Sequence, residues 1–185
     1  MSTEMIWETS STGSAETERL GELLGRYLNG GDAVELVSDL GGGKTTFVKG
    51  LAKGIGSTDS VSSPTFTLIN QYNPGTRRLL LVHIDTYRLG DPPTSTSVAS
   101  AAVEAANLGL EEILSDAPLA DSHSDGAIVV IEWAERVAEL LPTDTLYIHL
   151  TPVPSDENAR TATLMVASPE VAALLRQFAP NDLGQ

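Results

Sequence analysis

Residues 34–46 constrain the fold more than any other stretch, because an apolar, strand-like run leads directly into three glycines and Lys-Thr-Thr. The stretch fits the phosphate-loop pattern G-x-x-x-x-G-K-[ST], except that Ser38 stands where the first glycine is expected. The pattern requires a strand before the loop and a helix after it, and residues 47–54 have helical character. The alternative is a glycine-rich turn that merely joins a strand to a helix. The context on both sides favours a nucleotide site.

The residue types of this loop suit a bound triphosphate. Gly41, Gly42 and Gly43 let the backbone approach a phosphate without interference from a Cβ atom. The N–H groups of the loop and the positive end of the following helix then surround the anion. Lys44 can reach the β- and γ-phosphates, and the Thr45 hydroxyl is placed to bind Mg²⁺.

Length and composition predict one globular domain over residues 1–185. A chain of 185 residues with 41% apolar residues can bury a core of several strands with helices on both faces. The absence of cysteine excludes disulfides and thiolate metal sites. Residues 1–8 carry no basic, apolar signal and no window approaches 18 uninterrupted apolar residues, so we expect a cytoplasmic protein that does not enter a membrane.

The net charge of −14, from 11 basic and 25 acidic residues, repels nucleic-acid backbones and anionic membranes at long range. All three lysines, Lys44, Lys49 and Lys53, lie in the phosphate loop and the helix after it. This placement favours an anionic ligand at that end of the domain. If RNA is involved, we expect another protein to hold most of it.

Hydrophobic periodicity predicts alternating strands and helices. We expect strands over residues 5–9, 33–37, 67–72, 78–85, 127–131, 146–150 and 161–166, and helices over residues 15–28, 47–54, 108–114, 134–141 and 170–178. Ser14 is the expected N-cap of the first helix. The turn at residues 73–75 predicts a hairpin, and residues 91–106 read as a surface loop with a short helix at its end.

Two apolar strands each end in an acid, Asp85 and Glu132. In open α/β sheets ligands bind at the carboxyl ends of central strands, so both carboxylates are candidates for the chemistry. One could hold Mg²⁺ directly or through water, while the other orients or deprotonates the attacking water. The alternative for either acid is a cap of the following helix.

Several neighbouring residues carry weaker signals. His83, two residues before Asp85, is expected to be a hydrogen-bonded partner more often than a metal ligand. Arg88 either neutralises charge in a transition state or forms a structural ion pair. The stiff loop 63–66, with Thr65, occupies the topological place of a switch segment that senses a γ-phosphate. Trp133 either stacks on a base or partner or packs in the core.

Five stretches, taken together and in order, resemble the TsaE (formerly YjeE) family of bacterial ATPases in tRNA threonylcarbamoyladenosine biosynthesis. They are residues 38–50, 63–68, 83–89, 108–112 and 131–136, within a matching span of about 14–141. The resemblance implies a three-layer α/β P-loop NTPase-like fold with a mixed, partly antiparallel central sheet flanked by helices. It also implies weak ATPase activity inside a complex with the TsaB and TsaD proteins, which modify adenosine 37 of tRNAs, so that tRNA is met indirectly.

The resemblance implies roles for individual residues. Lys44, Thr65, Asp85 and Glu132 correspond to catalytic and switch positions, and Thr45, Glu132 and Asp85 to Mg²⁺ ligands. The residues implied for ATP/ADP binding are Ser14, Thr17, Asp39, Leu40, Gly41, Gly42, Gly43, Lys44, Thr45, Thr46 and Trp133. The chain departs from the family at Ser38 (usually Gly), at Ala134 (usually Pro) and over residues 94–106, which are less acidic than usual.

Two other functions fit the same loop. A small-molecule kinase would need a second substrate pocket and a lid with several arginines, whereas Arg77, Arg78 and Arg88 are the only arginines between the phosphate loop and Glu132. A nucleotide-gated interaction module would bind the nucleotide without meaningful turnover. Transfer of the γ-phosphate to a metabolite, instead of its release as free phosphate, would identify the kinase. A Glu132→Gln variant that still supports tRNA modification would favour the interaction module.

Overall fold

The computed structural model describes residues 3–89 and 104–176. In chain order the elements are β1 (Glu4–Ser11), α1 (Ser14–Gly25), β2 (Ala33–Val37), α2 (Lys44–Gly54), β3 (Ile69–Tyr72), β4 (Leu80–Asp85), α4 (Leu110–Asp116), β5 (Ala127–Glu132), the 3₁₀ turns η1 (Ala134–Arg136) and η2 (Ala138–Leu140), β6 (Leu146–Val153), β7 (Asp156–Val166) and α5 (Pro169–Leu175).

The strands form one seven-stranded sheet in the order β1-β7-β6-β2-β5-β4-β3. The four central strands β6, β2, β5 and β4 run parallel, while β3 pairs antiparallel with β4, and β1, β7 and β6 form an antiparallel set. The predicted hairpin of β3 and β4 is therefore confirmed. Because β2, β4 and β5 are parallel, the loop after β2 and the acids that end β4 and β5 lie at the same edge of the sheet.

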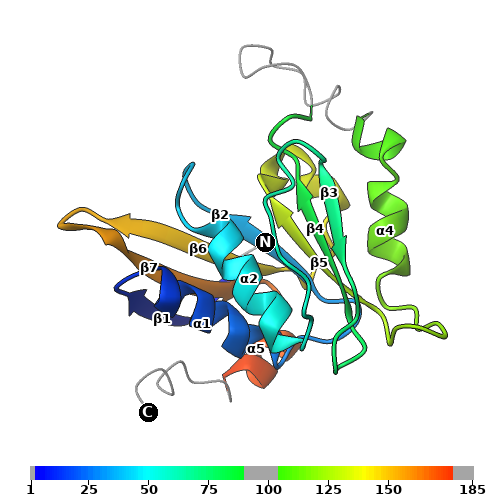
Figure 1. Ribbon diagram of the computed structural model, residues 1–185, viewed down its shortest axis with the longest axis horizontal. Helices are drawn as coiled ribbons and strands as arrows, with labels where there is room; N and C mark the ends of the chain where they lie inside the picture. The colour runs from blue at the N-terminus through cyan, green and yellow to red at the C-terminus, as the bar shows by residue number, and fades with distance from the viewer. Residues whose placement is uncertain (1–2, 90–103, 177–185) are drawn as a thin grey trace.

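Two hydrophobic cores lie on the two faces of the sheet, as the alternation of side chains along the strands requires. The first core joins Val34 and Leu36 of β2 to helix residues such as Leu20, Phe47 and Ala172. The second joins Val129 and Ile131 of β5 to α4 and the η1–η2 segment. Figure 1 shows α1 and α2 side by side against the sheet and α4 beyond β3 and β4. The predicted α/β P-loop NTPase-like class with a mixed sheet is confirmed.

Glycines allow α1 and α2 to pack with their backbones in contact. A Cβ atom on Gly50 of α2 would lie 1.8 Å from the carbonyl oxygen of Glu18, and one on Gly21 of α1 would lie 2.1 Å from that of Phe47. Neither distance is possible without moving a backbone. The tight contact fixes α2, and with it the phosphate loop, against the rest of the domain.

Three expectations about local structure need correction. Residues 134–141 form two 3₁₀ turns and no α-helix: Ala134 and Val137 are both buried, and a spacing of three matches one 3₁₀ turn. Ser14 is the first residue of α1 and Gly13 is the N-cap, while the Thr12 N–H donates to the Glu16 carboxylate instead. Residues 67–68 belong to a turn before β3.

Other expectations meet the limits of the described residues. Of the predicted loop at residues 91–106, only residues 104–106 are described, and they are helical as expected. The C-terminal helix α5 ends at Leu175 and residue 176 is a turn, while residues 177–178 of the predicted range lie outside the described residues. Within the described ranges, none of the helices has the length and apolar character needed to cross a membrane.

Candidate active site

The phosphate loop connects the end of β2 to the first residue of α2 and needs its glycines. Gly41 and Gly43 have φ values of +76° and +102°, which side chains disfavour. A Cβ atom on Gly42 would lie 2.2 Å from the Ser38 Oγ atom. Ser38 itself is accommodated because its hydroxyl donates to the Asp39 carbonyl at 3.0 Å. The departure from the usual first glycine therefore leaves the turn intact.

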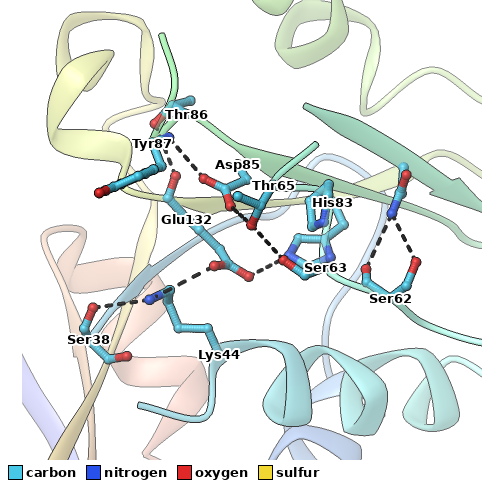
Figure 2. Close-up of polar contacts among 12 residues, drawn as sticks. Ser38, Lys44, Ser62, Ser63, Thr65, His83, Asp85, Thr86, Tyr87 and Glu132 are labelled. Atoms are coloured by element: carbon cyan, nitrogen blue, oxygen red, sulfur yellow. Dashed lines mark hydrogen bonds and ion pairs between the residues drawn. The ribbon is translucent and has the colours of Figure 1, made fainter. Parts of the chain in front are cut away.

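Lys44 lies at the centre of the site with only 6% of its surface exposed. Its Nζ atom donates to the Ser38 and Asp39 carbonyls at 3.1 and 3.2 Å. The same atom lies 3.9 Å from Glu132 Oε2 and 4.6 Å from the ring centroid of Trp133. Figure 2 shows the Lys44 side chain between Ser38 and Glu132. A buried cation with these neighbours is held in place, where it can contact an anion bound at the loop.

Asp85 and Glu132 are direct neighbours in the β4–β5 register, and they are 2% and 3% exposed. Glu132 Oε1 lies 2.8 Å from Nε2 of the fully buried His83. The Nδ1 atom of His83 has no hydrogen-bond partner among the described residues. A proton on Nδ1 would be a buried N–H without an acceptor, which favours the tautomer in which Nε2 carries the proton and donates it to Glu132. His83 is the hydrogen-bonded partner that its position suggested.

Both oxygens of Asp85 accept hydrogen bonds. The Thr65 hydroxyl donates to Oδ2 at 2.6 Å and the Tyr87 backbone N–H donates to Oδ1 at 2.9 Å. The Thr65 hydroxyl also lies 2.8 Å from that of Ser63 (Figure 2). Arg88 donates to the Thr65 carbonyl at 3.4 Å and forms no ion pair with a described residue. These bonds tie the candidate switch loop to the tip of β4.

A cavity of about 300 Å³ brings most of the predicted site residues together. Its lining is Leu40, Gly41, Gly42, Gly43, Lys44, Thr45, Thr46, Ser63, Thr65, Asp85, Tyr87, Glu132 and Trp133. Ser14 and Thr17 line a neighbouring cavity of about 200 Å³ that shares Gly41, Gly43 and Thr46 with the first. Asp39 lines neither and instead borders a groove on the sheet. The roles given to these residues stay predictions.

One residue of the site escaped the sequence reasoning entirely. Arg160 of β7 donates its Nε hydrogen to the Gly42 carbonyl at 3.2 Å and lines the cavity that holds Ser14 and Thr17. No local pattern marks it, because 118 residues separate it from its partner and only the pairing of β7 brings it to the loop. The same applies to the contact of Tyr87 with Trp133, whose ring centroids are 5.1 Å apart.

The side chains of the cavity fit a magnesium–nucleotide. The loop offers backbone N–H groups and one lysine, and Thr45, Asp85 and Glu132 offer hard oxygen atoms of the kind that Mg²⁺ prefers. No group of three metal-binding His, Cys, Asp or Glu side chains exists among residues 3–89 and 104–176. A magnesium ion here would therefore rely on phosphate and water for its remaining ligands, as is usual at nucleotide sites.

The fold and the loop define an α/β protein of the P-loop NTPase-like class. The family model "Threonylcarbamoyl adenosine biosynthesis protein TsaE" matches residues 11–162, and the chain belongs to this family.

Relatives named tRNA threonylcarbamoyladenosine biosynthesis protein TsaE support the assignment. The protein from Bacillus subtilis (strain 168) is 36% identical over 160 residues, 86% of this chain and 85% of that protein. The protein from Nostoc (strain PCC 7120) is 40% identical over 148 residues, 80% and 78% of the two chains. The crystal structure of YdiB from Bacillus subtilis is 27% identical, with a TM-score of 0.71, covering 98% of this chain and 99% of that one.

Proposed function

We propose that this protein is a Mg²⁺-dependent ATPase that hydrolyses ATP to ADP and phosphate in the service of tRNA threonylcarbamoyladenosine formation. The role in tRNA modification rests on the names of the relatives. We further propose that it works in the cytoplasm with TsaB and TsaD, which hold the tRNA, because a chain with a net charge of −14 is poorly suited to bind RNA by itself.

The convergence of Lys44, Thr45, Asp85 and Glu132 in one cavity carries the proposal of hydrolysis. A nucleotide-gated module needs only the loop. A water attack needs acidic groups beside it, and the site holds two buried carboxylates, Asp85 and Glu132, the second with an oxygen 3.9 Å from Lys44 Nζ. The lining of the cavity contains no arginine, and a small-molecule kinase would be expected to supply several.

The hydrogen bonds favour a division of labour between the two acids. Both oxygens of Asp85 accept hydrogen bonds, whereas Glu132 Oε2 lies near Lys44 with no hydrogen bond to a described residue. Glu132 with Thr45 would hold Mg²⁺, which when bound neutralises charge on the phosphates. Asp85 would orient or deprotonate the attacking water, and Thr65, which donates to it, would sense the γ-phosphate.

The proposal is tested by measuring release of radiolabelled γ-phosphate from ATP, with and without purified TsaB–TsaD. We expect free phosphate, formed faster with the pair present, and little or none from Glu132→Gln at unchanged ATP affinity. Label on a metabolite would instead identify a kinase. Full tRNA modification by the Glu132→Gln variant would contradict the need for hydrolysis and favour a nucleotide-gated module.

A further inference from the structure

Among residues 3–89 and 104–176, helices cover only half of the sheet face opposite α1 and α2. The second hydrophobic core on that face draws on β2, β3, β4 and β5, and no described residue of β1, β6 or β7 belongs to it. Tyr147 and His149 of β6 alternate with core residues of the opposite face and so lie on the uncovered part. A groove of about 640 Å³ opens there, at the boundary with η1.

Glu35 lies on the central strand β2 at the floor of this groove, between Ile131 of β5 and Tyr147 of β6. The residue is 8% exposed, and its carboxylate makes no hydrogen bond or ion pair with any residue in the described parts of the chain. Burial, and then the nearby Glu135, raise the pKa of the Glu35 carboxyl. A carboxylate on so buried a residue, open only to a groove and without a cation beside it, is costly, and such groups in cavities often mark binding sites.

The remainder of the groove suits an organic cation. Glu135 and Asp39 add two more carboxylates, Trp133 and Tyr147 add aromatic rings, and no lysine or arginine is among the described residues that line the groove. A guanidinium group pairs with carboxylates through its fork of N–H donors and stacks on aromatic rings. A metal ion is disfavoured, because no three metal-binding side chains gather anywhere in the described ranges.

We propose that this groove receives an arginine side chain of a protein partner, with Glu35 as its acidic counterpart and Trp133 and Tyr147 as aromatic walls. The proposal rests on the partnership with TsaB and TsaD put forward above, since a docked protein would bring such a side chain to an open groove. The negative charge of the groove selects a basic surface and repels RNA.

The groove adjoins the nucleotide site through two residues. Trp133 lines both cavities, and Asp39 borders the groove while its carbonyl accepts a hydrogen bond from Lys44. The Lys44 Nζ atom also lies over the Trp133 ring. An occupant of the groove would touch two of the groups that hold Lys44, so docking and nucleotide binding are expected to influence each other reciprocally.

The test is calorimetric titration of TsaB–TsaD from the same organism onto the full-length chain and its variants, with and without ATP. We expect Glu35→Gln to weaken binding by about tenfold or more, and Glu35→Lys to weaken it further. Glu111→Gln and Glu111→Lys, on the exposed surface of α4, are the matched controls and should bind like the unaltered chain. Glu35→Gln keeps the shape of the side chain. A melting temperature no lower than that of the unaltered chain would show that a loss of binding is not caused by unfolding.

The outcomes separate this inference from the function on which it rests. An unaltered chain that does not bind TsaB–TsaD would contradict the partnership itself. An unaltered chain that binds, with Glu35→Gln and Glu35→Lys binding equally well, would overturn the groove assignment and leave the partnership standing. Submillimolar binding of spermidine that Glu35→Gln abolishes would assign the groove to a free amine and overturn the arginine. A partner Arg→Glu substitution that restores binding only with Glu35→Lys would identify the arginine.

Discussion

The Nε2 atom of His83 donates to Glu132 Oε1 at 2.8 Å, and the two residues are 0% and 3% exposed. The two residues lie on neighbouring parallel strands, where His83 faces the position two residues before Glu132. One carboxylate oxygen is thereby fixed, and the other is directed to the side of Lys44. His83 is a positioning residue for the acid that we propose to hold Mg²⁺.

Replacing His83 by leucine should lower ATPase activity by about 10- to 100-fold, the usual effect of losing the residue that orients a metal ligand. The loss should appear as a higher Mg²⁺ concentration at half-maximal rate, because a freely rotating Glu132 binds the ion less well. His83→Gln places an amide N–H near the Nε2 position and should restore much of the activity. Equal Mg²⁺ requirements for His83→Leu and the unaltered chain would contradict a positioning role.

Replacing Thr65 by valine keeps the shape of the side chain and removes its 2.6 Å hydrogen bond to Asp85. We expect a loss of about 10²-fold or more in kcat with a small change in the affinity for ATP, because Asp85 would lose the group that orients it. Thr65→Ser retains the hydroxyl and is the matched control. Single-turnover kinetics measure the catalytic rate, and a separate titration measures the affinity for ATP. A Thr65→Val variant changed only in its affinity for ATP would contradict the role of Thr65 in orienting Asp85.

Replacing Gly50 by alanine should destabilise the protein by about 1–3 kcal/mol, the usual cost of overpacking. The added methyl group would meet the Glu18 carbonyl at 1.8 Å and force α1 and α2 apart. Lys49→Ala is the control, since Lys49 precedes Gly50 in the same helix and is exposed. Urea denaturation followed by circular dichroism measures both, and equal midpoints would show that the helices can separate without cost.

The parts of the site that could be predicted from the sequence are those fixed by local pattern. The phosphate loop needs only its glycines, Lys44 and Thr45, and the acids at the ends of β4 and β5 follow from the rule that parallel strands present their carboxyl ends at one edge. Arg160 could not be found this way, because the pairing of distant strands brings it to Gly42. The α-helix predicted over residues 134–141 is wrong because the spacing of its apolar residues fits the period of an α-helix and that of a 3₁₀ helix equally.

Glu35 was also present in the sequence as a charged residue within a central apolar strand, but its burial depends on which strands flank β2. The insertion of β2 between β5 and β6 follows from long-range pairing that no stretch of sequence encodes by itself. The same long-range strand pairing determines which half of the sheet the described helices leave uncovered. Sequence pattern places the phosphate loop, whereas the groove beside it emerges only from the strand order.

Replacing Glu35 by glutamine should stabilise the isolated chain at neutral and alkaline pH. Burial, and then Glu135, raise the pKa of the Glu35 carboxyl in the folded protein. The folded state therefore holds the proton more tightly than the unfolded state, and stability falls as the pH rises through the raised pKa. Glutamine removes the buried charge, which should raise Tm by about 2–4 °C, the shift expected for about 1 kcal/mol in a domain of this size.

The gain in Tm should shrink as the pH is lowered through the raised pKa of Glu35, because the protonated carboxyl and the amide then cost similar amounts to bury. Differential scanning calorimetry of both proteins from pH 4 to pH 8 measures this difference, with the exposed Glu111→Gln as a control that should stay close to the unaltered chain. If the difference in Tm between Glu35→Gln and the unaltered chain does not change with pH, the stabilisation comes from packing and not from the removal of a charge. A stabilised Glu35→Gln chain that binds its partner less well would show that this acid is kept at the expense of stability.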